Sequence, residues 1–493
     1  MTQNCPVTPS EPSLPLTGES PKRDSSTGSG VSGLRLFKHQ IQGVDFLIKG
    51  NRALFWEMGT GKTITAIAAF CGLRVKNPGL RLLVVAPLSL LNAAWAKDAA
   101  AYAPNLIVHN FHDDKDIPAL YDILVVNFEA LISPKNMGIL LTEVAKGPFC
   151  IVVDESSRMK NHKSKTTKAL LSLSPKFKHR IIMSGTPAPN SEMEYWAQAE
   201  FLKPGIFGGN FFKFRNIYFH LSRGNQVMQG QFMTRHQAAQ IFSKGWKYSI
   251  TASKRQELMA LIAPLCSRLQ KADCLDLPEQ IDEVREVEMT ANQKRIYKEM
   301  RTTLIAEIKG KTIAAMAALT KLMKLRELSS GFAYDERGEA HAIPGPNPKL
   351  NELLDVIEEA GDQQVIVWAN FTWEIREIVS ALSKIAPTRA LSSETKDRDQ
   401  VINDFIGGSV KYLVAHPRSA AHGLTFVNCS MQIFFSLDYS WESHEQARAR
   451  THRAGQKKNC TYVYLIAKGT IDEDILATLR RKGDAQEILW GLK

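Results

Sequence analysis

A chain of 493 residues is too long for one ordinary hydrophobic core, so its length predicts about two to four domains. The hydrophobic content of 44% and charged content of 23% are typical of globular proteins, and no apolar run reaches the roughly 18–20 residues that a membrane helix needs. Basic residues exceed acidic ones by twelve, which favours a polyanionic partner but says nothing about the fold.

The N-terminal segment has a different composition from the rest of the chain. Residues 1–33 are rich in Ser, Pro, Thr and Gly and nearly lack large apolar side chains. Such a segment cannot bury enough surface to offset its ordering entropy, so we expect a disordered tail. It also lacks the basic and apolar regions of a signal peptide. The seven cysteines show no CxxC pair and no zinc-type spacing, which is typical of a reducing compartment.

From Leu34 onwards, short β-rich runs alternate with amphipathic stretches. The runs are RLLVVA (81–86), ILVVN (123–127), CIVVDE (150–155) and RIIMSGT (180–186). This alternation predicts a parallel sheet with helices on both faces. After PGIFGG (204–209) the strand signals stop for about seventy residues. Because FFKFRNIYF (211–219) and SKRQELMALIAPL (253–265) look helical, we expect a helical insertion at about 205–270.

A second alternation fills the remainder of the chain. Strand signals resume at EVREVEM (283–289), and a helical block at 291–330 ends in the turn-rich AIPGPNP (342–348). Further β-rich runs are QVIVWAN (364–370), KYLVAH (411–416), MQIFFSL (431–437) and TYVYLIA (461–467). The sequence therefore predicts two α/β domains, at 34–280 and 281–493, with a second helical insertion at about 291–345.

A phosphate-binding loop is predicted within RALFWEMGTGKTITAIAAF (52–70). A short apolar run precedes the glycines and an amphipathic helix follows them, which is the context that a P-loop requires. Gly59 and Gly61 let the backbone wrap around phosphate, with amides and a helix N-terminus facing it. Lys62 would neutralise the terminal phosphates.

One further feature supports this prediction and one departs from the strict motif. Thr63 follows the lysine, where its hydroxyl would be available to magnesium. The strict GxxxxGK[ST] pattern fails, because Trp56 occupies its first glycine position, and the shorter GxGKT remains.

An acid pair completes the predicted site. CIVVDE ends in Asp154 and Glu155, directly after a buried apolar run. Asp154 can hold magnesium there, and Glu155 can orient or deprotonate the attacking water. The alternative, two ordinary polar residues at a strand end, is weaker because the pair falls where a nucleotide hydrolase needs it.

The phosphate loop and acid pair belong to an ordered set of segments that spans about 450 residues. The others are KHQIQGVDFL (38–47), VVAPLSLLNAAW (84–95), VVNFEAL (125–131), DESSRMKN (154–161), MSGTPAPN (183–190), LKPGIFG (202–208), SRLQKADCLDLPEQ (267–280), AHGLTF (421–426) and QARARTHRAGQ (446–456). In this order the chain resembles superfamily 2 helicases, and most closely the Swi/Snf-like DNA translocases of a minimal, bacterial or phage type.

The resemblance implies two tandem RecA-like P-loop lobes, with ATP and Mg²⁺ bound in the cleft between them and movement along double-stranded DNA. It also implies roles for individual residues. They are Gln40, Met58, Gly59, Thr60, Gly61, Lys62, Thr63 and Gln446 for ATP; Thr63 and Asp154 for magnesium; Lys62, Glu155, Arg450 and Arg453 for catalysis; and Lys160, Asn161, Ser184, Gly185, Thr186, Gly423 and Thr425 for coupling or DNA contact.

The chain departs from the family pattern at three places. Ser157 stands in the histidine position of DEAH, which should change the coupling to the SGT segment and leave the magnesium chemistry intact. Trp56 replaces an acid ahead of the phosphate loop. Ala420 and Ala421 replace a glycine pair at the start of AHGLTF, which weakens the case for DNA contacts there.

Three arginines lie within QARARTHRAGQ (446–456). If this stretch is helical, at about 100° per residue, Arg450 and Arg453 share a face with Gln446, while Arg448 points about 200° away from Arg450. The planar, always charged arginine fork can bind a phosphoryl group bidentately. We therefore expect Arg450 and Arg453 to act on the γ-phosphate and Arg448 to be solvent-exposed or ion-paired, without a part in the reaction.

Some segments allow two interpretations. The basic run Lys160, His162, Lys163 and Lys165 could follow DNA phosphates or form a solvated face. The aromatic and basic residues of FFKFRNIYF (211–219) could stack on bases, although core packing is favoured. SGT (184–186) could link the ATP state to the DNA path or be a plain turn.

The leading interpretation is a DNA-dependent ATPase that moves along double-stranded DNA. A fork-remodelling or branch-migrating helicase stays open, although no strand-separating pin is visible. A non-catalytic DNA-binding protein with a relic motor is disfavoured by the intact Lys62, Asp154 and Glu155. We expect double-stranded or branched DNA as partner, a directing protein as a further possibility and no membrane. The expected location is the cytoplasm, as nucleoid or phage-infected bacterial cytoplasm, or the nucleus in a eukaryote.

Overall fold

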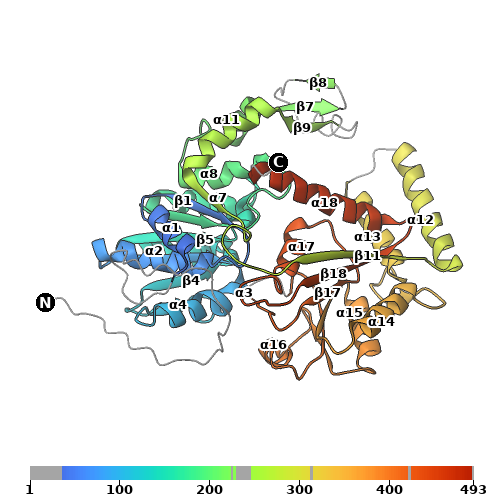
Figure 1. The fold of residues 1–493 in the computed structure, drawn as a ribbon. Coiled ribbons are helices and arrows are strands. Elements are labelled where there is room, and N and C mark those ends of the chain that lie inside the picture. Colours follow the sequence, from blue (N-terminus) through green and yellow to red (C-terminus); the bar gives the residue numbers. More distant parts are fainter. Residues whose placement is uncertain (1–35, 224–225, 229–245, 311–314, 420–423, 491–493) are drawn as a thin grey trace. The chain divides into compact units, whose positions relative to one another are not determined.

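The protein consists of two compact units, each with its own parallel sheet (Figure 1). The computed structural model describes residues 36–223, 226–228, 246–310, 315–419 and 424–490, so the expected tail at 1–33 lies outside the described residues. The first unit holds Met1–Pro187, Glu192–Tyr218 and Ala252–Asp276, and the second holds Ala188–Ser191, Phe219–Thr251 and Leu277–Lys493. The prediction of two tandem α/β domains is confirmed.

The first unit is built on a seven-stranded sheet whose pairs all run parallel. The strand order is β10-β1-β6-β5-β2-β4-β3. The strands are β1 (Arg52–Trp56), β2 (Arg81–Ala86), β3 (Val108–Asn110), β4 (Ile123–Asn127), β5 (Phe149–Asp154), β6 (Arg180–Met183) and β10 (Cys266–Leu269). Every residue of the central strands β2, β4 and β5 is buried except the half-buried Arg81 at the start of β2, as the continuous apolar runs predict.

Helices cover both faces of this sheet. One face packs on α1, α2 and the continuous helical stretch α3–η1–α4, in which η1 is a π-helical turn. The other face packs on helices that include α8. The helices are α1 (Lys38–Leu47), α2 (Lys62–Lys76), α3 (Leu88–Leu90), η1 (Leu91–Ala96), α4 (Lys97–Tyr102), α5 (Phe128–Ile132), α6 (Pro134–Ala145), η2 (Ser156–Met159), α7 (Lys165–Leu173), η3 (Ser174–Lys176), η4 (Glu192–Glu194), α8 (Tyr195–Leu202), α9 (Phe211–Tyr218), α11 (Ala252–Ile262) and η5 (Ala263–Leu265).

The second unit is built on a six-stranded parallel sheet of order β11-β18-β17-β14-β16-β15. Its strands are β11 (Gln280–Val287), β14 (Val365–Trp368), β15 (Thr388–Leu391), β16 (Tyr412–Ala415), β17 (Met431–Phe434) and β18 (Cys460–Ala467). Its helices are α12 (Ala291–Gly310), α13 (Ala315–Ser329), α14 (Pro348–Ala360), α15 (Thr372–Leu382), α16 (Arg398–Ile406), α17 (Trp441–Arg448) and α18 (Ile471–Trp490).

The second sheet also has a core on each face. On one face α14 and α15 pack against Val365, Val367 and Leu465. On the other, α13, α16, α17 and α18 pack against Ile366 and Trp368. Side chains alternate between the two faces along each strand, so the continuous apolar runs supply both cores. None of the described helices is long and apolar enough to cross a lipid bilayer.

Both inserted segments contain strands that the sequence analysis does not anticipate. The first includes an antiparallel sheet of order β8-β7-β9, with β7 (Phe219–Arg223), β8 (Gln226–Met228) and β9 (Lys247–Ile250), and then β10 of the main sheet. The second includes an antiparallel hairpin of β12 (Phe332–Tyr334) and β13 (Ala340–Ala342). The expected helices α9, α11, α12 and α13 are present in these insertions, and the strands are an addition that the sequence analysis did not predict. These strands are short and largely unburied, so no apolar run marks them.

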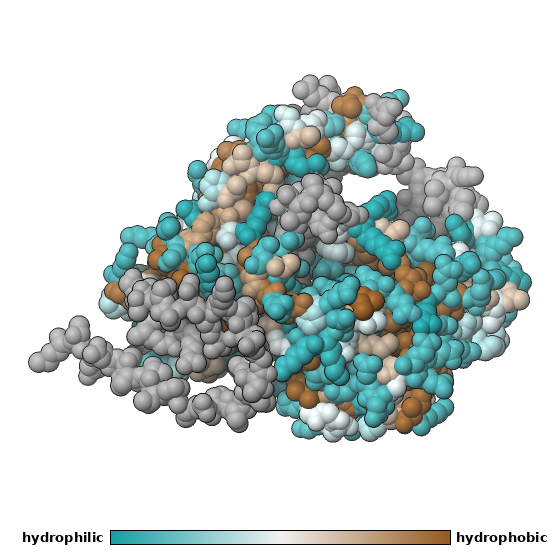
Figure 2. Space-filling model, in the orientation of Figure 1, coloured by the Kyte–Doolittle hydropathy of each residue, from teal (hydrophilic) through white to brown (hydrophobic). Residues whose placement is uncertain are grey.

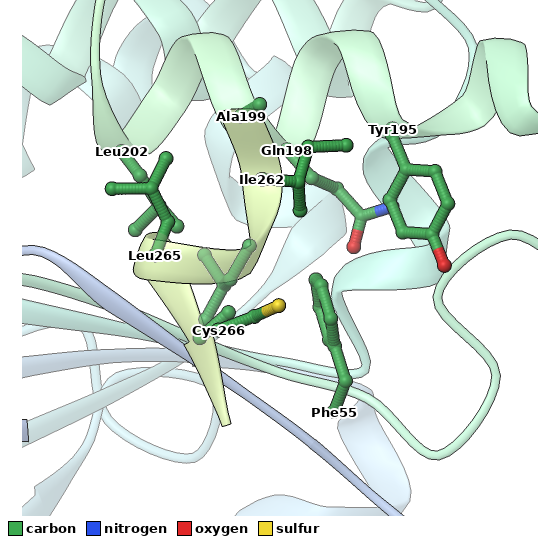
Figure 3. Close-up of a pocket in the computed structure, with 10 residues that line it drawn as sticks. Phe55, Tyr195, Gln198, Ala199, Leu202, Ile262, Leu265 and Cys266 are labelled. Atoms are coloured by element: carbon green, nitrogen blue, oxygen red, sulfur yellow. The ribbon is translucent and has the colours of Figure 1, made fainter. Parts of the chain in front are cut away.

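The first unit encloses a small apolar cavity beside β1 (Figure 3). Phe55 and Cys266 of the sheet face Tyr195 and Leu202 of α8 across it. Its volume of about 10 Å³ is the space of one water molecule. The cavity is therefore a packing gap and is too small for a ligand.

Helix α9 of the first insertion packs on the turn that follows the acid pair. His162 stacks on Phe211, with ring centroids 3.5 Å apart and planes at 10°, and lies edge-on to Trp196. Phe214 and Tyr218 of the same helix are buried. Core packing is thus the role that the structure shows for most of the aromatic residues of this helix.

Burial, together with the nearby cations Lys163, Arg215 and Lys168, lowers the pKa of His162 to about 4. In an unfolded chain a histidine has a pKa of about 6.5. Between these values the unfolded chain binds a proton that the folded one does not, so the free energy of unfolding falls as the pH drops from about 6.5 to about 4.

We predict that this loss of stability is smaller in a His162→Phe variant, which keeps an aromatic ring on Phe211 and removes the titrating group. Urea unfolding at about pH 7 and about pH 5 measures it, because the difference between variant and wild type isolates His162 from the other histidines. Equal pH dependence in the two proteins would contradict the prediction.

Candidate ATP-hydrolysis site

The phosphate loop lies between β1 and α2. Gly59 and Gly61 have φ values of 85° and 81°, a left-handed conformation that favours glycine. Gly61 is the N-cap of α2, so the first amides of the helix face the loop. The Lys62 Nζ donates hydrogen bonds to the carbonyl oxygens of Trp56 and Glu57, at 2.9 and 3.1 Å. The loop is therefore folded in a phosphate-binding form around its lysine.

Helix α1 packs tightly against this loop. A Cβ at Gly61 would lie 2.1 Å from the Gln40 Nε2, so a side chain there would displace the Gln40 amide from its place against the loop. His39 donates from Nε2 to the Thr60 carbonyl at 3.0 Å. The expected adenine-reading residue Gln40 thus lies directly against the phosphate loop.

Trp56, the departure ahead of the loop, has a structural explanation. Its indole would come within 2.4 Å of a Cβ at Gly43, so it fills the space that this glycine leaves on α1. The indole N–H donates to the Ser267 hydroxyl at 2.9 Å. Trp56 therefore joins α1, the end of β1 and the start of β10, and fixes the base of the phosphate loop.

The acid pair lies at the carboxyl end of β5. Asp154 is buried and accepts hydrogen bonds from the Trp95 indole N–H at 3.0 Å and from the Glu155 amide at 2.9 Å. Burial raises the pKa of the Asp154 carboxyl, although the Lys62 ammonium and these two donors act in the opposite direction. Lys62 and Asp154 are thus brought together, two strands apart in the sheet.

Glu155 has a φ of 51°, and it is the one residue other than glycine with positive φ in the described part of the chain. A non-glycine residue in this region stores about 1–3 kcal/mol of strain, which the surrounding structure must offset. Strain of this kind is concentrated at functional sites. The side chain is buried next to Asp154, as a residue that orients a water molecule needs.

The SGT segment contacts the loop from β6. A Cβ at Gly185 would lie 2.8 Å from the Met58 Cγ, and both Ser184 and Thr186 are buried. The Ser184 amide donates to the Leu54 carbonyl at 3.1 Å. This segment is therefore packed on Met58 of the phosphate loop.

The buried Gln198 joins η2 (Ser156–Met159), the turn after the acid pair that we call the acid turn, to the end of the SGT segment. The Ser156 hydroxyl donates to the Gln198 Oε1 at 2.8 Å, and the Gln198 Nε2 donates to the Pro187 carbonyl at 2.6 Å. This bridge runs beside Ser157, which is fully buried in the position of the expected histidine.

These residues fit a magnesium nucleotide. The glycine loop presents amides to an anion, and the desolvated Asp154 beside Lys62 is a carboxylate ligand of the kind that Mg²⁺ prefers. Thr63 follows Lys62 in the first turn of α2. When bound, the ion would neutralise charge on the phosphates.

The arginine segment of the second unit is not helical throughout, so the expectation of a shared helical face for Arg450 and Arg453 is wrong. Helix α17 ends at Arg448. The Arg448 carbonyl then accepts from the Gln432 Nε2 and the Tyr462 hydroxyl, both at 3.2 Å. These tertiary hydrogen bonds replace helical ones, and residues 449–453, which we call the arginine loop, follow as turns.

Arg450 and Arg453, which we call the finger arginines because they are expected to act on the γ-phosphate, are nonetheless brought together. Arg450 and Arg453 each donate from Nη1 to the Leu424 carbonyl, at 2.9 and 3.0 Å. The Arg450 Nε also donates to the carbonyl of Gln446, at 2.7 Å. A common acceptor, rather than a helical repeat, places the two guanidinium groups side by side.

Arg448 is ion-paired, as one of the expected alternatives had it, but it is mostly buried. Its side chain is 13% exposed and pairs with Asp282 at 2.6 Å. Its guanidinium lies 3.9 Å from the centre of the Tyr462 ring and also bonds the Tyr464 hydroxyl.

The other residues that were expected to contact DNA differ in exposure. Lys160 is half-buried and Asn161 is exposed, and the Asn161 side chain accepts from the Lys163 amide at 3.0 Å. Thr425 is half-buried, whereas Gly423, Ala420 and Ala421 lie outside the described residues.

Sequence reasoning missed several residues that support the site. Trp95 holds Asp154, His39 holds the loop at Thr60, and Gln198 bridges the acid turn to Pro187. Trp95 ends the segment VVAPLSLLNAAW, and a tryptophan that closes a motif could have suggested a role. Gln198 lies within the buried helix α8, where a polar residue needs a partner.

Two parallel-sheet lobes with a phosphate loop, an acid pair and an arginine loop define a P-loop ATPase of the two-lobed helicase type. The SNF2-related domain matches residues 39–331, and the helicase conserved C-terminal domain matches residues 348–455. The chain belongs to the SNF2-related family, the ATP-dependent DNA motors of helicase superfamily 2.

Relatives include viral and eukaryotic proteins. The chain is 25% identical over 484 residues to protein p41 of Acyrthosiphon pisum secondary endosymbiont phage 1, covering 92% of this chain and 97% of that protein. It is 26% identical over 507 residues to chromodomain-helicase-DNA-binding protein 1 of Gallus gallus, covering 94% of this chain but 27% of that protein. It also resembles the Sulfolobus solfataricus SWI2/SNF2 ATPase core in complex with dsDNA, at 25% identity, a TM-score of 0.42 and coverage of 93% and 94%.

We predict that Ser156 and Gln198 stabilise the first unit as a pair. Ser156→Ala and Gln198→Met each leave a buried polar group unpaired, which costs about 1–3 kcal/mol. The double variant should lose less than the two single losses added together, by about 0.5–3 kcal/mol. Urea unfolding of the four proteins measures this, and strict additivity would contradict the bridge.

Proposed function

We propose that the protein hydrolyses ATP with Mg²⁺ at this site and uses the energy to move along double-stranded DNA without separating the strands. The observation that carries the proposal is the glycine loop at the N-terminus of α2, with Lys62 next to the buried Asp154. Family membership supports it, and so does the excess of twelve basic residues.

In the proposed reaction the first unit binds and orients the reactants. The amides of residues 59–63 and the Lys62 ammonium hold the phosphates, while Thr63 and Asp154 hold magnesium. Glu155 orients the attacking water and accepts its proton. Gln40, seated against Gly61, contacts the adenine.

The second unit contributes Arg450 and Arg453, whose forked cations stabilise charge on the γ-phosphoryl group during transfer. Gln446 lies one turn before Arg450 and is buried, and its Nε2 has no hydrogen-bond partner among the described residues. An unsatisfied buried donor of this kind supports a place for Gln446 in nucleotide binding.

We predict that Arg450→Ala and Arg453→Ala each lower the DNA-stimulated ATPase rate by roughly 10³–10⁵-fold, the range that arginine fingers supply in GTPases. Steady-state kcat at saturating DNA measures the loss. Arg376→Ala is a matched control, because this exposed arginine pairs only at the surface with Glu394. A loss below about ten-fold at both finger positions would contradict their assignment.

Duplex DNA is the proposed track. On the face drawn in Figure 2, hydrophilic residues predominate and apolar ones lie in small groups, as suits a polar partner better than an apolar one. SGT, packed on Met58, is proposed to link the ATP state to DNA, and Lys160, Asn161 and Thr425 are proposed to contact it. A bacterial or phage-infected cytoplasm is the proposed location, supported by the similarity to the phage protein over its length.

We predict that duplex DNA stimulates ATP hydrolysis more than single-stranded DNA or RNA, because the proposed track is an intact duplex. The same protein should displace the third strand of a triplex without melting the duplex below it. ATPase and strand-displacement assays with this set of nucleic acids, including branched DNA, measure both.

Lys62→Ala is the control for the site, and it should abolish turnover while DNA binding is kept. Hydrolysis that does not respond to any nucleic acid would sink the motor proposal. Forks separated or junctions migrated with ATP would instead support the remodelling helicase, which is the second candidate and lacks a specific observation in its favour.

A further inference from the structure

The segment that joins the two units is bonded to the base of the phosphate loop at its first end. This connector is residues 270–279, between β10 and β11. The Lys271 amide donates to the Glu57 Oε2 at 2.7 Å, and the Glu57 amide donates to the Leu269 carbonyl at 2.9 Å. Leu275 closes a turn onto the Lys271 carbonyl at 2.8 Å. Glu57, two residues before Gly59 of the phosphate loop, therefore holds the first half of the connector.

The second end of the connector is bonded to the arginine loop. His452 donates from Nε2 to the Pro278 carbonyl at 2.9 Å and accepts at Nδ1 from the Gln280 Nε2 at 3.0 Å. The Gln280 Oε1 in turn accepts from the Arg448 Nη2 at 3.1 Å. Asp282, one residue further along the same face of β11, pairs with Arg448.

These contacts bracket the finger arginines. Arg448 and His452 bond the connector and the start of β11, while Arg450 and Arg453 point to Leu424. His452 and Thr451 are buried, so the loop cannot shift without breaking these bonds. Only two residues, Asp276 and Leu277, lie between the turn that ends at Leu275 and the bonded Pro278.

We propose that Arg448 and His452 anchor the arginine loop to the connector, so that displacement of the connector moves Arg450 and Arg453 and thereby sets the rate of ATP hydrolysis. This rests on the proposed function, and it makes Arg448 and His452 positioning residues. One short covalent segment then links the base of the phosphate loop to the arginine loop. Arg448 was expected from the sequence to have no part in the reaction. In this proposal it acts indirectly, by positioning Arg450 and Arg453.

The anchor also explains why Arg448 is ion-paired and mostly buried. An arginine out of water is costly unless several acceptors satisfy its guanidinium. Asp282, Gln280 and the Tyr464 hydroxyl supply them, and two of the three belong to β11. An isolated surface ion pair would not need this arrangement.

The test combines a loss of the anchor with a looser connector. Arg448→Met removes the charge and keeps a long side chain, and a second variant has two glycines inserted between Asp276 and Leu277. Each should lower kcat at saturating DNA by about ten-fold or more, with the KM for ATP changed less than about two-fold. Arg448→Lys should recover part of the loss. The double variant should be no slower than the slower single one, because both changes break one path.

Arg285→Ala is the matched control. Arg285 is an arginine of the same strand, but it lies on the opposite face and pairs with Glu359 and Glu283. Its removal should leave kcat within about two-fold of wild type. Independent losses that multiply in the double variant, or a wild-type kcat in Arg448→Met, would overturn the proposal.

Hydrogen exchange of residues 449–456 gives a readout that does not depend on turnover. The connector insertion should accelerate amide exchange in this segment, and Arg448→Met should do the same. Unchanged exchange in both variants would overturn the anchor even in an active enzyme. Accelerated exchange in a protein without ATPase activity would uphold the anchor and reject the proposed function alone.

Discussion

The first unit depends on holding the half-buried Lys62 ammonium beside the buried Asp154 carboxyl. Asp154 is buried at the end of β5, and the nearby positive charge is that of Lys62. Lys62 begins the helix that follows β1, and β6 lies between β1 and β5 in the sheet. Burial of a carboxylate is expensive unless it is paired and hydrogen-bonded, so the Trp95 indole and the Glu155 amide are as necessary as Lys62. The parallel sheet makes the arrangement possible, because the carboxyl ends of all its strands meet at one edge.

Around this pair the structure accepts a strained backbone and close contacts that place the side chains of the site. Glu155 adopts a left-handed backbone, and Gly61 leaves room for Gln40 where any side chain would clash. Trp56 fills the space over Gly43 and binds Ser267, so that α1, β1 and β10 meet at the base of the loop. The strain at Glu155 persists because the strand before it is fully buried and cannot relax.

In the second unit, two arginines are held in place on an irregular loop. Outside a helix, the backbone groups must find other partners. The side chains of Gln432, Tyr462 and Gln456 supply them, and the last donates to the carbonyls of Cys429 and Thr451. Irregular backbone held by buried side chains is rigid, yet it can be moved as a body if its anchors move. The proposed anchoring of the arginine loop depends on this property.

The sequence by itself determined the two parallel sheets, because continuous apolar runs such as ILVVN and TYVYLIA can be buried only with helices on both faces. It also determined the phosphate loop and the acid pair, since both are contiguous and each follows a strand. The sequence did not predict short strands such as β8 and β9, because strands that pair through backbone hydrogen bonds without burial leave no apolar pattern in the sequence. Only the tertiary structure decided that α17 ends at Arg448, that Leu424 gathers the two finger arginines, and that Gln198 joins the acid turn to Pro187. Each of these rests on contacts between residues remote in the chain, and no periodicity records such contacts.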